Sequence, residues 1–99
     1  MLKISDDAIE ITIRFFEAIR ILKRKRKIRG LKTFTTKYGI NYWNMSTLEK
    51  EPHKRILKPE FIMYLVRDFN ISSEWILLGT GDMMRHDCDL QKRNISEPE

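Results

Sequence analysis

The chain has 99 residues, which is enough for one domain with a modest hydrophobic core. Hydrophobic residues make up 41% of it and charged residues 33%, the balance of an ordinary water-soluble protein. Its apolar stretches are much shorter than the roughly 20 residues of a membrane span, so neither a membrane protein nor a signal peptide is expected. The single cysteine, Cys88, cannot form an internal disulfide, which favours a reducing cytoplasm.

Positive charge is concentrated in one part of the chain. The net charge is +5, but no acidic residue occurs between Ala18 and Leu48. That interval contains nine basic residues: Arg20, Lys23, Arg24, Lys25, Arg26, Lys27, Arg29, Lys32 and Lys37. Acidic residues outnumber basic ones before Ala18 and again from Asp82 onward. A local positive field of this kind indicates a polyanionic partner.

The first helix is expected to begin between Ser5 and Thr12. Ser5 followed by two aspartates is a helix N-cap with acids in the first turn. Isoleucines at alternate positions from 9 to 13 fit a strand equally well. Residues 1–11 are therefore either an N-terminal arm or the start of this helix. The basic run Lys23 to Lys27 is expected to end it.

Two short helices joined by a tight turn follow. The first is predicted from Leu31 to Tyr38 and the second from Tyr42 to Lys50. Gly39 can adopt the left-handed backbone of a helix end, and the Asn41 side chain can cap the next helix. Two helices meeting through a glycine-containing turn form a helix-turn-helix unit.

The remaining residues predict two more helices. Pro52 interrupts, Lys58-Pro59-Glu60 begins a fourth helix that Asn70 ends, and Ser72 or Ser73 caps a fifth that stops at Gly79. The chain is thus expected to be an all-α domain over residues 12–84, followed by a polar, flexible tail over 85–99. The expected core consists of Phe16, Ile19, Leu22, Phe34, Tyr38, Met45, Leu48, Leu65, Val66, Phe69, Trp75 and Leu78.

Several of these residues together resemble the lambda-repressor-like helix-turn-helix family of phage repressors, Cro and XRE-type regulators. The resemblance covers Phe15 to Met84. It rests on the closing phrase NISSEWILLGTGDM and on Arg24, Phe34, Tyr38, Gly39, Ile40, Met45, Leu48 and Glu49. The resemblance implies a compact five-helix DNA-binding domain with the helix Tyr42–Lys50 in the major groove.

Site residues follow from the resemblance and from helical geometry. Residues expected to face bases are Tyr42, Trp43, Ser46 and Thr47. Residues expected to contact phosphates are Lys32, Lys37, Asn41, Lys50, Lys54 and Arg55. The resemblance also implies a structural ion pair between Arg24 and Glu49. The chain departs from the family at Leu31, where a phosphate-anchoring glutamine is usual.

The predicted function is sequence-specific binding of double-stranded DNA by a small repressor-like transcriptional regulator of phage or mobile-element type. A homodimer is expected, joined through Ile76, Met83 and Met84 or, alternatively, through the N-terminal arm. The exposed aromatic pair Tyr42 and Trp43 leaves open a protein-binding module. A polybasic membrane-surface segment is a third and weaker reading.

Chemistry of other kinds is not expected. His86 and Cys88 lie close together, but one pair without a second falls short of a structural zinc site. No grouping of nucleophile, base and acid has a credible spacing, so the chain is not expected to be an enzyme. No metal, cofactor or small-molecule substrate is predicted.

Overall fold

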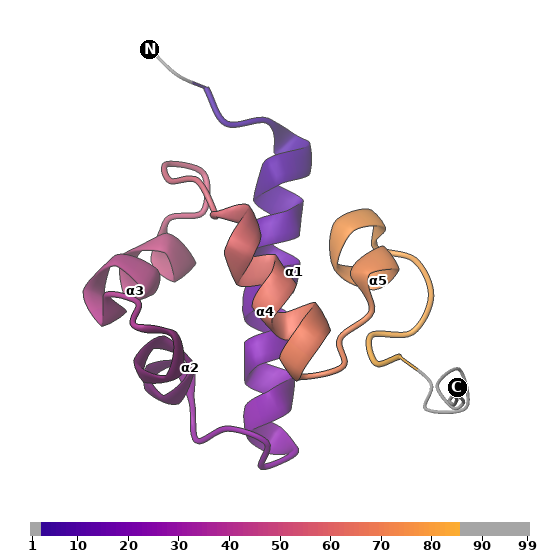
Figure 1. Cartoon of the computed structure of the whole chain (residues 1–99). Helices are drawn as coiled ribbons and strands as arrows, with labels where there is room; N and C mark the ends of the chain where they lie inside the picture. Colours follow the sequence, from indigo (N-terminus) through magenta and orange to yellow (C-terminus); the bar gives the residue numbers. More distant parts are fainter. Residues whose placement is uncertain (1–2, 86–99) are drawn as a thin grey trace.

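The computed structural model describes residues 3–85, which form five α-helices around one core (Figure 1). The helices are α1 (Asp6–Arg24), α2 (Leu31–Tyr38), α3 (Tyr42–Lys50), α4 (Pro59–Asp68) and α5 (Ser73–Leu78). This confirms the all-α prediction over the described range. No described helix has the length and apolar character needed to cross a bilayer. The predictions for His86, Cys88 and most of the tail fall outside the described residues.

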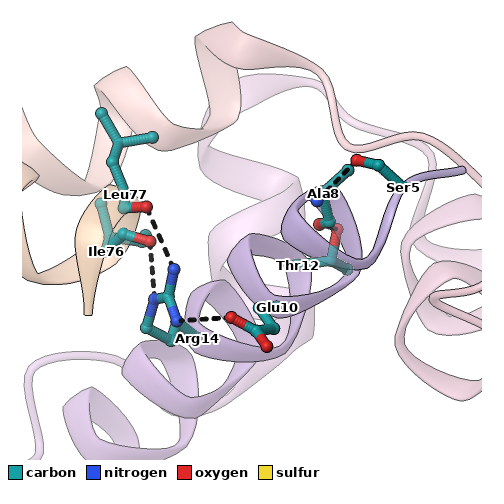
Figure 2. Close-up of polar contacts among 7 residues, drawn as sticks. All are labelled: Ser5, Ala8, Glu10, Thr12, Arg14, Ile76 and Leu77. Atoms are coloured by element: carbon teal, nitrogen blue, oxygen red, sulfur yellow. Dashed lines mark hydrogen bonds and ion pairs between the residues drawn. The ribbon is translucent and has the colours of Figure 1, made fainter.

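Helix α1 begins at Asp6, which decides between the arm and the helix predicted for the first eleven residues. The Ala8 N–H donates to Ser5 Oγ at 3.2 Å, as expected for an N-cap (Figure 2). Thr12 is buried, and its hydroxyl donates to the Ala8 carbonyl at 3.0 Å. The alternating isoleucines are therefore helical. The helix ends at Arg24, earlier than predicted, because Arg26 adopts a left-handed backbone with φ of 62°.

The predicted bounds of α2 and α3 are confirmed. Gly39 lies in the left-handed region with φ of 66°, and the Ile40 N–H donates to the Thr35 carbonyl at 2.8 Å. The Asn44 N–H donates to Asn41 Oδ1 at 2.9 Å, which caps α3. This short turn brings α2 and α3 into contact, and α3 also contacts α1.

The core combines predicted residues with others outside the predicted set. Phe15 is fully buried and makes edge-to-face contacts with Phe16 and Phe34, with ring centroids 5.0 and 5.7 Å apart. Leu78 was predicted to be in the core but is 69% exposed, whereas Ile76 is completely buried. The other predicted core residues that are only partly buried are Tyr38, Val66, Phe69 and Trp75.

Arg14 of α1 forms two hydrogen bonds with the backbone of α5. Arg14 Nε donates to the Ile76 carbonyl at 2.9 Å and Arg14 Nη2 donates to the Leu77 carbonyl at 3.1 Å (Figure 2). A cation at these carbonyls also complements the negative end of the helix dipole. Because the Ile76 side chain is fully buried in the core, the predicted dimer surface is wrong at that residue.

The segment after α5 folds back onto the end of α4. The Ser72 N–H donates to the Met83 carbonyl at 2.7 Å, and the Arg85 N–H donates to the Asn70 carbonyl at 2.8 Å. Arg85 Nη2 also donates to the Val66 carbonyl at 2.9 Å. Arg85, placed in the tail by the sequence, is thus hydrogen-bonded to the folded domain.

Candidate nucleic-acid interface

The outward face of α3 carries the candidate base-contacting residues. Met45 and Leu48 are buried, so the opposite side of the helix faces solvent. Trp43 is 75% exposed and meets the Tyr42 ring edge-to-face, with centroids 5.5 Å apart. Ser46 and Thr47 are half-buried. The Thr47 hydroxyl donates to the Trp43 carbonyl at 2.8 Å, which leaves its oxygen free to accept a hydrogen bond.

The predicted phosphate contacts are all exposed, but the structure gathers only some of them. Asn41, Lys54 and Arg55 line one groove of about 680 Å³, together with Asn44 and Lys58. Lys32 and Lys37 lie on α2, and Lys50 lies at the end of α3. Three of the six residues therefore share one groove, and the other three lie on α2 and α3 outside its lining.

Two of these groups are already engaged within the protein. Lys54 Nζ lies 3.9 Å from Glu51 Oε2, so part of its charge is compensated. Asn41 Oδ1 accepts the capping bond of α3, which leaves the side-chain amide N–H groups as its available donors. Asn41 can therefore donate to a phosphate while it caps the helix.

An ion pair between Arg20 of α1 and Glu49 of α3 joins these two helices. The predicted pairing of Glu49 with Arg24 is therefore wrong. Arg20 Nη1 donates to Glu49 Oε2 at 3.0 Å. Arg24 stands one turn further along the same face, at the last residue of α1, and its side chain is exposed. The side chains of Arg20 and Glu49 are 56% and 37% exposed, so the pair is worth only about 0–1 kcal/mol.

An aromatic and ionic cluster that the sequence did not indicate joins α2 to α4. The rings of Tyr38 and Tyr64 stack in parallel with centroids 4.0 Å apart. The Tyr38 hydroxyl donates to the Asp68 carboxylate. Arg67 holds the same carboxylate through two bonds of 2.9 Å, from Nε and Nη2. Since Tyr38 directly precedes the turn into α3, the cluster helps to fix the orientation of that turn.

The cluster predicts a loss of stability at high pH. Burial, followed by the hydrogen bond to Asp68, raises the pKa of Tyr38 from 10.0 to about 12. A phenol with a raised pKa in the folded state stabilises the protein below pH 10 and loses this contribution as pH rises towards 12. Thermal melting between these pH values should therefore show a fall that Tyr38→Phe reduces. Equal falls for Tyr38→Phe and wild type would contradict this assignment.

The carboxylate in the cluster responds in the opposite direction. Hydrogen bonds from Arg67 and then from Tyr38 hold the pKa of Asp68 well below its usual range. Its contribution to stability is therefore present above the ordinary carboxyl pKa and is lost as pH falls through the lowered value. Asp68→Asn should also return the pKa of Tyr38 towards 10, because it removes the nearby negative charge.

In the described residues, α3 packs against α1 and α2 and leaves one face exposed to solvent. Exposed cations lie on α2, at the end of α3 and in the loop after it, and the outward face of α3 carries a tryptophan. Comparisons of the chain with models of known protein families, with curated protein sequences and with solved structures found no significant match.

Proposed function

We propose that the chain binds double-stranded DNA by placing the outward face of α3 in the major groove, as a small repressor-like transcriptional regulator. The observation that carries the proposal is the position of Trp43. It projects from the first turn of an exposed helix, inside a stretch of sequence with no acidic residue. The major groove accepts one α-helix, and apolar side chains can contact the thymine methyl group there.

The surrounding charges support the same docking. Phosphate contacts fix the register of a protein on DNA, whereas contacts to base edges specify the sequence. Lys37 lies on the helix before the turn, Lys50 at the end of α3, and Arg55 in the loop after it. In the proposed complex these cations contact phosphates on either side of α3. A homodimer bound to two half-sites, about one helical turn apart, belongs to the same proposal.

A protein-binding role is the second candidate. It is favoured by the edge-to-face pair of half-buried Tyr42 and exposed Trp43, since aromatic residues are enriched at protein interfaces. Duplex binding distinguishes the two roles, because a DNA-binding protein of this kind selects particular duplex sequences. A protein module would show no preference among duplex sequences.

The test begins by selecting bound duplexes from a random library and measuring their affinity by fluorescence anisotropy. Trp43→Ala should then weaken binding to the best duplex by about tenfold, or ~1.4 kcal/mol, because one base contact is lost. Its melting temperature should stay close to that of wild type, since the side chain is exposed.

Leu78→Ala supplies the matched control, because Leu78 is also a large exposed apolar residue but lies on α5. It should leave DNA affinity unchanged. The proposal fails when wild type selects no duplex, or when the two substitutions reduce affinity equally.

A further inference from the structure

A second concentration of positive charge lies away from the outward face of α3. Four basic side chains line a hollow of about 620 Å³ together with Ile28 and Thr33. The cations are Lys23, Arg26, Lys27 and Arg29. They belong to residues 23–29, here called the basic turn, which ends α1 and leads towards α2 at the bottom of Figure 1. None of them is among the six predicted phosphate contacts.

The charge of this hollow is not compensated within the described part of the chain. Ion pairs there are formed by Arg14, Arg20, Lys54 and Arg67, and by none of the four cations of the hollow. No acidic residue lines the hollow. Like charges gathered around one space repel one another, so an anion that enters it relieves this repulsion.

The basic turn has a defined backbone. Ile28 is buried in the core and anchors its far end. The Lys27 N–H donates to the Leu22 carbonyl at 2.9 Å, and the Arg26 N–H donates to the Lys23 carbonyl at 3.0 Å. These contacts order the backbone that carries the cationic side chains before any ligand binds. The conformational entropy that is lost on binding is therefore smaller.

We propose that the hollow binds phosphate groups, either neighbouring phosphates of a nucleic-acid strand or those of a free polyphosphate. Arginine and lysine are the usual partners of phosphate oxygens, and the Thr33 hydroxyl adds a donor. Only the nucleic-acid source rests on the proposed DNA binding. When the ligand is a nucleic-acid strand, the DNA-contacting surface extends past α2 to the end of α1. It then includes residues beyond those that the helix-turn-helix resemblance implies.

Two double substitutions of equal charge test this site. Lys27→Gln with Arg29→Gln removes two cations of the hollow. Arg24→Gln with Lys25→Gln removes two exposed cations of the same segment that do not line it. Both variants leave Arg26 in place, so the left-handed backbone at that residue is unchanged. Melting curves establish that each variant is folded.

The first probe is a short duplex of random sequence, with affinity measured over a range of salt concentrations. Each lost phosphate contact lowers the slope of log affinity against log salt by about 0.9, so Lys27→Gln with Arg29→Gln should lower it by about 1.8. The Arg24 and Lys25 variant should change the slope by less than about half of that amount.

The second probe is inorganic triphosphate, followed by isothermal titration. When wild type binds no duplex, the proposed DNA function fails. The hollow is still supported in that case when Lys27→Gln with Arg29→Gln weakens triphosphate binding and the other pair does not. The inference is overturned when the two pairs behave alike with both probes, because net charge alone then explains the binding.

Discussion

Raising the salt concentration from about 50 to about 200 mM is expected to weaken binding to duplex DNA by on the order of 10³. About five or six cationic contacts to phosphates give this magnitude, because each one releases a condensed counterion from the DNA. The candidates are the exposed cations Lys32, Lys37, Lys50, Lys54 and Arg55. Lys54 should contribute least among the cations, since Glu51 lies 3.9 Å from it.

Fluorescence anisotropy across the salt series measures this effect. Melting curves at the same salt concentrations serve as the control, because they separate loss of binding from loss of folded protein. An affinity that stays constant over this range would remove the electrostatic basis of the proposed function. A smaller but measurable slope of log affinity against log salt concentration would indicate fewer phosphate contacts.

Replacing Phe34 by alanine should lower the free energy of unfolding by about 3–5 kcal/mol. The side chain is fully buried, and its ring lies 5.7 Å from that of Phe15 and 5.0 Å from that of Tyr38. The substitution leaves a cavity between α1 and α2 in addition to the lost transfer energy. A loss of this size is a large share of the roughly 5–15 kcal/mol that stabilises a typical domain.

Urea denaturation followed by circular dichroism measures this change in stability. Leu78→Ala is the control, because that side chain is 69% exposed and should alter the free energy of unfolding by less than about 0.5 kcal/mol. DNA affinity should fall with the folded fraction in Phe34→Ala. Similar denaturation midpoints for the two variants would show that Phe34 is not central to the core.

The sequence predicts helix ends well where a single residue determines them. Gly39 ends α2 and Asn41 begins α3, because each supplies a local backbone or side-chain property that few other residues supply. The start of α1 was ambiguous for the opposite reason. Alternating isoleucines suit a strand, and only the Ser5 cap and the contacts of the finished domain favour the helix.

Contacts between distant elements could not be predicted in the same way. Arg20 and Arg24 are four residues apart on one face of α1, so periodicity cannot decide which of them reaches Glu49. Helix α5 has only six residues, too few to fix from the sequence whether Ile76 or Leu78 points inward. The cluster around Tyr38 likewise depends on the packing of α2 against α4.

The contact of Arg14 with the end of α5 has a consequence for synthesis on the ribosome. Arg14 and Ile76 are 62 residues apart in the chain, yet they are hydrogen-bonded in the folded protein. At translation rates of about 5–20 residues per second, the first helix waits roughly 3–12 s for the carbonyls that Arg14 binds. Ile76, which is fully buried, arrives at the same late moment. The core is therefore completed only after all five described helices have been made, so folding is expected to wait for α5 and not to proceed stepwise as each helix is synthesised.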